Sequence, residues 1–384
     1  MKCAQAGRRI SWSALPIKRR KPADATAHLS VEHPLKTISV SHRTQLVVSL
    51  AIFAAVAGGW NFLSAPAAAQ NQVSEILARA RVFPGVGPGV RALKRDSAGR
   101  YYVLATPANA IAVFGADGAR TGQIPAPDSQ PSKIVFAEDI DLDASGRLFV
   151  ADRGANAVKI FKVDGSLEST IPVSAPTSLA SLSDDEFAVA SLRADRLVTI
   201  YNSRGKTIRS FGDPHDMSSS AELNRYINHG RLSSDPSGFI YFAFTYLPEA
   251  TIRKYDRFGY AAYEISLPHS DTESRRALLA PSVDISALAR RNQASEVKPV
   301  INAFGVDPAS QELWAAMGDE LSRFDKDGRL VATYRTATQD GTRLEPSAIL
   351  IEPNRILLAV DPLGVYEFAR PDKQRLAPVA APHP

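Results

Sequence analysis

The chain has 384 residues, of which 45% are hydrophobic and 22% are charged, so it has enough apolar side chains for a folded core. Its net charge of +5 comes from residues 1–69, which contain nine Lys or Arg and two Asp or Glu. The remaining residues include 36 basic and 38 acidic side chains, a net charge of −2. Because nucleic-acid binding needs a surplus of positive charge, this class of function is excluded for residues 70–384.

Residues 1–69 have the pattern of a leader with a signal peptide. An apolar core at 46–63 follows Arg43, and three alanines at 67–69 offer a cleavage site after Ala69. We therefore expect export to the periplasm or the outside of the cell. The alternative is an uncleaved membrane anchor, since about 18 apolar residues approach the length that spans a bilayer. The stretch before the core is long for a signal peptide, which a true translation start near Val40 would explain.

The single cysteine, Cys3, lies in this leader. The exported part would therefore contain no disulfide, no thiol nucleophile and no thiolate ligand for a metal. A domain of about 300 residues buries enough surface to be stable without disulfides.

Between the leader and a Pro/Ala-rich tail at 377–384, the sequence repeats one pattern. Each unit has a polar or Gly-containing turn, a short apolar strand, a second polar turn and another apolar strand. The units lie at residues 96–124, 138–165, 180–211, 231–265, 303–334 and 348–369. A first strand precedes the first of these turns, and a fourth strand follows the second apolar strand. Each unit therefore has four strands. The pattern predicts an all-β fold over residues 70–376, a six-bladed β-propeller of four-stranded antiparallel blades.

The clearest unit, residues 138–165, resembles an NHL repeat. It contains Ile140-x-Leu142-Asp143-x-x-Gly146, then Leu148-Phe149-Val150-Ala151-Asp152, and finally Asn156, Val158, Ile160-Phe161 and Gly165. The other five units keep the order of strands and turns but lose most of these residues. The resemblance implies a propeller of the NHL-repeat type and says little about function, because such folds serve in binding, scaffolding and catalysis.

A closed ring needs one more strand for the last unit. That strand is either Arg375–Val379 or an early segment, Glu75–Phe83, and we favour the early segment.

Two insertions interrupt the repeats, at residues 212–230 and 268–299. Both fall between a fourth strand and the next first strand, so we expect them on one face, over one mouth of the central channel. Ser219 or Ser220 could cap a short helix that runs through Tyr226.

Aligning the units on their turns predicts which residues surround this mouth. The first strands begin at Ala92, Asp139, Ser178, Arg231, Ala303 and Ala348. Adding positions after the second strands gives the candidate ligand-binding residues Asp139, Arg153, Arg193, Arg231, Tyr246 and Asp361. Three arginines would suit a polar or anionic ligand. The simpler interpretation is a set of ion pairs, such as Arg231 with Asp139, that seals a water-filled channel.

Metal-dependent chemistry is the alternative. Three of the four histidines after the leader, His215, His229 and His269, fall in or beside the insertions and could bind zinc, as in amidating-lyase-like propellers. Glu138, Asp139 and Asp141 could bind calcium, as in lactonase-like propellers. No close His-x-His or His-Glu-x-x-His spacing, nucleophile elbow, phosphate loop or dinucleotide-binding motif is present.

These features predict an exported binding module rather than an enzyme. It would recognise a small polar ligand or a protein partner at one mouth of the channel, without a cofactor or a catalytic residue. We expect a monomer that contacts the membrane only through the leader, if the leader is uncleaved. The alternative is a metal-dependent hydrolase or lyase that uses zinc or calcium at the same mouth.

Overall fold

A computed structural model describes residues 73–105, 109–126, 132–183, 185–218, 221–267 and 299–373. All of them belong to one compact unit that begins at Pro66. The leader with its apolar core and cleavage site, His269, most of the second insertion and the tail lie outside the described residues. None of the described helices has the length and apolar character needed to cross a bilayer.

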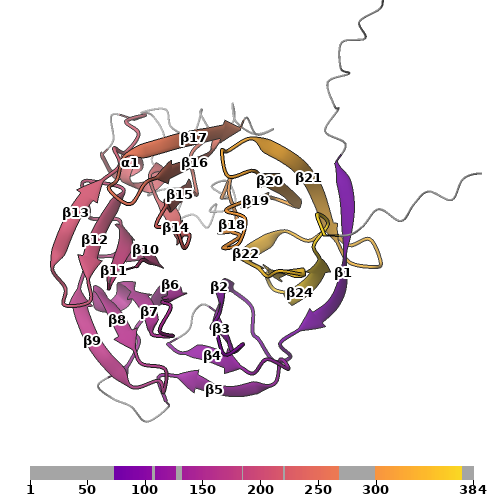
Figure 1. Cartoon of the computed structure of the whole chain (residues 1–384), viewed down its shortest axis with the longest axis horizontal. Coiled ribbons are helices and arrows are strands. Elements are labelled where there is room, and N and C mark those ends of the chain that lie inside the picture. The colour runs from indigo at the N-terminus through magenta and orange to yellow at the C-terminus, as the bar shows by residue number, and fades with distance from the viewer. Residues whose placement is uncertain are drawn as a thin grey trace, which may run out of the picture. The chain divides into compact units, whose positions relative to one another are not determined.

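The described strands form four four-stranded antiparallel sheets and one eight-stranded sheet, set around a central axis (Figure 1). The first two four-stranded sheets contain β2 (Val90–Arg95), β3 (Tyr101–Ala105), β4 (Ile111–Phe114) and β5 (Arg120–Ile124), then β6 (Ala137–Leu142), β7 (Leu148–Asp152), β8 (Ala157–Phe161) and β9 (Leu167–Pro172). The next two contain β10 (Pro176–Ser181), β11 (Glu186–Ser191), β12 (Val198–Asn202) and β13 (Thr207–Phe211), then β14 (Gly230–Ser234), β15 (Ile240–Phe244), β16 (Ala250–Tyr255) and β17 (Ala261–Leu267). A short helix, α1 (Ala221–Ile227), lies between β13 and β14.

The eight-stranded sheet has the order β18-β19-β20-β21-β1-β24-β23-β22. Its strands are β1 (Ser74–Val82), β18 (Ala303–Val306), β19 (Leu313–Met317), β20 (Glu320–Phe324), β21 (Leu330–Ala337), β22 (Pro346–Ile351), β23 (Arg355–Val360) and β24 (Gly364–Ala369). The prediction of a propeller with four-stranded antiparallel blades is confirmed. The prediction of six separate blades is met only in part, because β1 joins the last seven strands, β18 to β24, into one eight-stranded sheet.

The early strand closes the ring as expected. The first half of β1 pairs in parallel with β21, from Ser74 opposite Tyr334 to Leu77 opposite Ala337. Its second half pairs antiparallel with β24, from Ala78 opposite Phe368 to Val82 opposite Val365. With nine residues, β1 is long enough to cover both edges. The alternative closing strand, Arg375–Val379, lies outside the described residues.

The turn residues explain why the strands end where the sequence pattern predicts. Asp143 accepts hydrogen bonds at Oδ1 from the backbone N–H groups of Ser145 and Arg147, at 2.9 Å each. Gly146 then has φ of 83°, a conformation that side chains with a Cβ adopt with strain. The same Asp-x-x-Gly arrangement recurs at Asp96 and Gly99, where φ is 86°.

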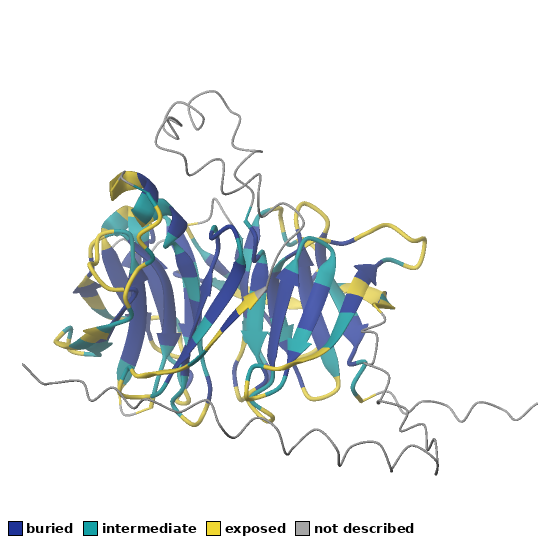
Figure 2. Cartoon of the chain, turned by 90° about the horizontal axis from the view of Figure 1, so that it is seen from above, coloured by how far each residue is buried: buried dark blue, intermediate teal, exposed yellow. Residues whose placement is uncertain are grey.

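The core lies between neighbouring sheets. The strands are mainly buried, whereas exposed residues gather in the turns at both rims (Figure 2). Among the described residues, the buried apolar side chains form six clusters. One cluster, for example, packs Leu93 and Tyr101 against Leu357 and Val365 and so joins the first repeat to the last.

We expect the closing strand to stabilise the ring through its buried face. In β1, Ala78 is 5% exposed and packs in a core cluster, whereas Ala80 is exposed. Ala78→Asn should lower the free energy of unfolding by about 2–3 kcal/mol, because it buries an amide without partners and overfills the site. Ala80→Asn, the matched control, should change it by less than about 0.5 kcal/mol. Urea denaturation measures both, and equal effects would contradict a closing role for this face.

Candidate functional site

Six strands line the central channel: β2, β6, β10, β14, β18 and β22 (Figure 1). In four of them the pairing register shifts by one residue near the start of the strand, which marks a β-bulge. The residues at these shifts are Arg91, Glu138, Thr177 and Ser347. All four line one cavity at this end of the channel. The bulges thus place a set of polar side chains around the mouth.

This mouth cavity has a volume of about 230 Å³. Besides the four bulge residues, its lining consists of Gly89, Val90, Asp139, His229, Arg231, Thr245, Tyr246, Pro299, Asn302 and Asp361. A second cavity of about 320 Å³ occupies the channel toward the other end of the same strands. Arg91, Asp139 and Arg231 line both cavities and form the waist between them.

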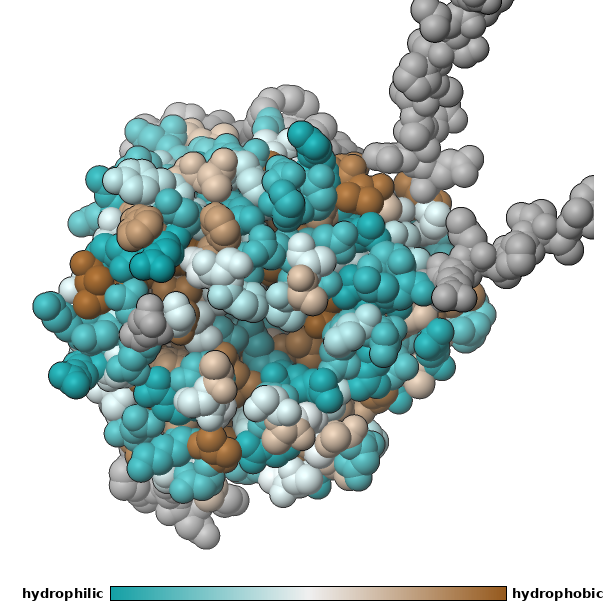
Figure 3. Space-filling model, viewed as in Figure 1, coloured by the Kyte–Doolittle hydropathy of each residue, from teal (hydrophilic) through white to brown (hydrophobic). Residues whose placement is uncertain are grey.

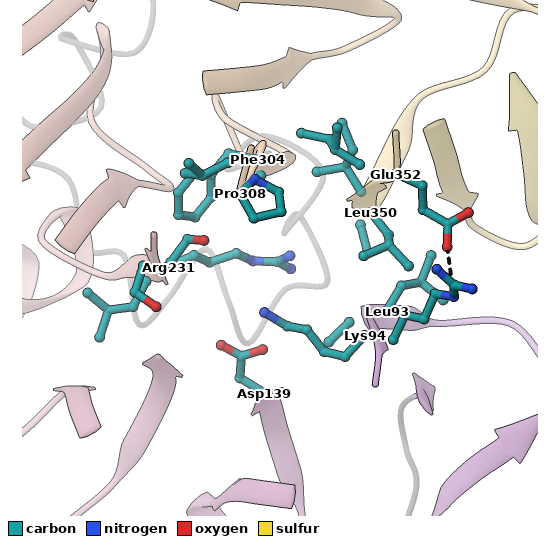
Figure 4. A pocket seen from close by; sticks show the side chains of 18 of the residues that line it. Leu93, Lys94, Asp139, Arg231, Phe304, Pro308, Leu350 and Glu352 are labelled. Atoms are coloured by element: carbon teal, nitrogen blue, oxygen red, sulfur yellow. Dashed lines mark ion pairs between the residues drawn. The ribbon is translucent and has the colours of Figure 1, made fainter. Parts of the chain in front are cut away.

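Arg231 spans the waist. Its Nη1 donates hydrogen bonds to the backbone oxygens of Arg91, at 3.2 Å, and Ser347, at 3.0 Å, on two other inner strands. Figure 4 shows Arg231, Lys94 and Asp139 extending from three strands toward the centre, while Phe304, Pro308 and Leu350 form an apolar side. The expected Arg231–Asp139 interaction is therefore one of charge at longer range, and the guanidinium binds backbone carbonyls.

The other charges at the waist are also compensated. Asp139 accepts hydrogen bonds from the Ser178 hydroxyl and from the backbone N–H of Leu179. Burial raises the pKa of the Asp139 carboxyl, against the opposing effect of Lys94 and Arg231. Lys94 lies 2.7 Å from an Asp141 carboxylate oxygen. Burial would lower the pKa of Lys94, but the carboxylates of Asp141 and Asp139 outweigh this and raise it.

At the mouth, one carboxylate pairs with two arginines. Glu138 lies 2.5 Å from Arg91 Nη1 and 2.8 Å from Arg153 Nε. The Arg153 guanidinium also lies 5.1 Å from the centre of the Phe136 ring. Glu138 thus holds two arginine side chains in place at the mouth, where Asp139 and Asp361 are further carboxylates of the cavity lining.

His229 lies beside this cluster, just before β14. Its ring is 5.6 Å from that of Tyr246, which stacks in turn on Tyr226 at 4.5 Å. Its Nδ1 is buried and has no hydrogen-bond partner among the described residues. Burial, together with the charges of Arg231, Arg91 and Arg153, lowers the pKa of His229 to about 4. The imidazole is therefore neutral at pH 7.

A second unpartnered group shares the cavity. Thr245 follows β15 and is 5% exposed, and its buried Oγ1 has no hydrogen-bond partner. Its backbone is fixed, since its N–H donates to His229 O at 2.9 Å and its carbonyl accepts from Val300 at 2.7 Å. The mouth cavity thus presents two polar atoms that the described residues leave unsatisfied.

The structure brings together most of the residues predicted from sequence. Asp139, Arg231, Tyr246 and Asp361 line the mouth cavity, and Arg153 reaches it through Glu138. Arg193 does not join them: it is exposed in the loop after β11. Whether these residues bind a ligand stays a prediction.

Sequence reasoning missed Arg91, Thr177, Thr245 and Asn302, and it considered Glu138 only as a calcium ligand. The signal available was a polar residue just before five of the six aligned strand starts, such as Arg91 before Ala92. Simple alternation does not reveal such a residue, because a bulge inserts it outside the period of two.

The described residues contain no group of three His, Cys, Asp or Glu side chains close enough to hold a metal ion. The proposed calcium ligands Glu138, Asp139 and Asp141 each bind donors or basic side chains of the protein. His215 lies away from the mouth, with Nε2 at 3.1 Å from Arg253 Nη2. Since His269 is outside the described residues, the three-histidine zinc site stays a prediction.

Comparison with solved structures finds similarity to β-propeller proteins. The WD40 repeats of RRP9 match with a TM-score of 0.50 and 11% identity, over 77% of this chain and 99% of that one. A catalytically inactive virginiamycin B lyase from Staphylococcus aureus, in a structure with quinupristin, matches with a TM-score of 0.48 and 14% identity, over 75% and 82%. No family model and no curated protein matches the sequence. At such identities the similarity supports the fold alone.

We expect Arg231 to stabilise the waist through its hydrogen bonds to two backbone carbonyls and, at longer range, by compensating part of the Asp139 charge. Arg231→Met should lower the free energy of unfolding by about 3 kcal/mol at neutral pH, because it removes these hydrogen bonds and weakens the compensation of a buried carboxylate. Because burial already raises the Asp139 pKa, the folded state protonates this group at higher pH than the unfolded state does. The contribution of Asp139 to the free energy of unfolding therefore falls as pH rises. Arg231→Met should accordingly lower the free energy of unfolding less at about pH 4.5 than at neutral pH.

The control for this variant is Arg231→Met combined with Asp139→Asn, which should recover part of the loss at neutral pH. Urea denaturation of the natural chain, the two single variants and the double variant, at both pH values, measures these free energies of unfolding. A loss that is independent of pH, with no recovery in the double variant, would refute the charge-compensation role.

His229 should make the protein less stable in mild acid. The unfolded chain protonates it below about pH 6.5, whereas the folded chain resists protonation down to about pH 4. Stability is therefore lost as pH falls through this interval, by about 1–2 kcal/mol between neutral pH and about pH 5. On acidification, the free energy of unfolding of His229→Gln should fall by that much less than the free energy of unfolding of the natural chain. Denaturation curves at both pH values test this, and parallel losses in the two proteins would contradict it.

Proposed function

We propose that residues 70–376 form an exported, NHL-repeat-like six-bladed β-propeller that binds a small polar ligand in the mouth cavity. The observation that carries this proposal is the pair of buried, unpartnered polar atoms, His229 Nδ1 and Thr245 Oγ1, in one cavity. A buried polar atom without a partner costs about 1–3 kcal/mol. A ligand or ordered water that bonds to both atoms would recover this cost.

Six blades are the simplest account of the eight-stranded sheet. We interpret it as two blades, β18–β21 and β22–β24 with β1, which β1 links by pairing with both. The six apolar clusters support this count, because a closed ring of six blades has six interfaces. Export through the leader, with cleavage after Ala69, would place the domain in the periplasm or outside the cell.

The surface also favours a recessed ligand over a flat partner. On the face turned to the viewer in Figure 3, hydrophobic side chains form small separate groups among hydrophilic ones. A large apolar docking surface would gather them into one patch. The mouth cavity instead offers charged and hydrogen-bonding side chains fixed on strands, which suits the orientation of a small molecule.

The metal-dependent hydrolase or lyase is the second candidate, favoured by one observation. His229 is neutral and its Nδ1 is unpartnered, so the imidazole could bind a metal ion. Elemental analysis of the dialysed mature chain separates the two candidates. Stoichiometric zinc or calcium that is lost in His229→Ala would favour the enzyme.

The binding proposal is tested by thermal-shift screening of the mature chain, residues 70–384, against a library of small polar metabolites. We expect compounds that raise the melting temperature of the natural chain but have little effect on His229→Gln or Thr245→Val. Thr333→Val on β21 is the matched control and should keep the response, since Thr333 is not among the residues that line the cavity. No stabilising compound, or stabilisation that persists in both mouth variants, would count against the proposal.

A further inference from the structure

A third cavity, of about 420 Å³, lies between the sheets β10–β13 and β14–β17, beside α1. We call it the inter-blade cleft. Its apolar lining residues are Ala190, Leu192, Ala194, Leu197, Pro214, Ala221 and Phe242. Its polar lining comes mainly from α1 and from the segment before it.

The amides of this lining are already satisfied by the protein. Asn228 donates from Nδ2 to the carbonyls of His215 and Asn224 and accepts from the backbone N–H of His215. Asn224 accepts at Oδ1 from Met217 and Ser218 and donates to Asp216. These bonds fix the segment to α1. The lining also includes the charged side chains of Asp195, Arg196 and Arg225, while its aliphatic side chains and Phe242 offer a surface for apolar contact.

The cleft adjoins the mouth cavity. Thr177 and His229 line both cavities, so the two spaces meet at these residues. The cleft alone, at about 420 Å³, lies in the range of small-molecule sites, which are roughly 300–1,000 Å³. A molecule with an apolar body and a polar head would fit across this boundary.

The charges around His229 select the sign of the polar head. After burial, the charges of Arg231, Arg91 and Arg153 are the main causes of the depressed pKa of His229. Asp139 and Asp361 also line the cavity, but they accept hydrogen bonds from the Ser178 hydroxyl and from the backbone N–H of Gly89. An anionic group is attracted to this position, and it would also favour protonation of the imidazole.

We propose that the ligand is an amphipathic organic anion, with its acidic group against His229 and Thr245 and its apolar body in the inter-blade cleft. This inference rests on the proposed function and adds the class of ligand. Carboxylates and phosphates are both compatible with it, since either group can accept hydrogen bonds from the Thr245 hydroxyl and from a protonated His229.

The test is an NMR titration of the mature chain, labelled at its histidine rings, with three probes: octanoate, acetate and 1-octanol. Octanoate should bind at least about tenfold more tightly than either of the others, because acetate lacks the apolar body and octanol lacks the charge. It should also raise the pKa of His229. Ala194→Trp, which narrows the cleft at an exposed position, should reduce octanoate affinity to that of acetate.

Ala262→Trp, an exposed position on β17 outside the cleft lining, is the matched control and should bind octanoate normally. Unchanged acetate binding in Ala194→Trp shows that this variant is folded. Equal affinity for acetate and octanoate would overturn the proposal that the cleft binds the apolar body, but it would leave the mouth as a binding site. Octanol binding as tight as that of octanoate would overturn the proposal that the ligand has an anionic head. If no probe perturbs His229, the inference is overturned, while the metabolite screen still decides the proposed function.

Discussion

The pairing of the first strand with the last repeat is the constraint on which the rest of the structure depends. β1 pairs with β24 across nearly 300 residues of sequence and also covers β21, so two strand edges that would otherwise be open are paired by one segment. This closure costs chain entropy, which grows only slowly with loop length. It fixes the sheets around the axis and so sets the positions of the inner strands that form the channel.

With the ring closed, the side chains on the inner strands decide what the channel can hold. Arg231 crosses the channel to bind the backbone oxygens of Arg91 and Ser347. The residues that follow these two, Ala92 and Ala348, also line the channel, and their small side chains leave room for the long Arg231 side chain. The crossing lies between the two cavities of the channel. Arg91, Glu138, Thr177 and Ser347, which stand at the β-bulges, line the mouth cavity. Backbone irregularities thus place polar side chains at one end of a repetitive fold.

The repeat architecture could be predicted from the sequence because its signals are local. Short runs such as 240–244 and 320–324, together with the Asp-x-x-Gly turns, predict strands to within one or two residues, and the predicted short helix through Tyr226 is present as α1. The closing role of β1 followed from the need to cover an open edge. The site was only partly predictable. Arg231 and Tyr246 were found by aligning repeats, but the bulge residues fall outside the alternation. The hydrogen bonds of Asn224 and Asn228 depend on how the segment before α1 folds back on the helix. The burial of Thr245 without a partner among the described residues depends on packing between segments distant in sequence, which no local pattern encodes.

A crystal structure of the mature chain, at a resolution that shows ordered water, tests most directly whether the mouth cavity is a binding site. The account predicts density for solvent or a small molecule within hydrogen-bonding distance of both His229 Nδ1 and Thr245 Oγ1. A protein side chain in that volume, bonded to both atoms, would contradict it, because the cavity would then be part of the core rather than a place for a ligand.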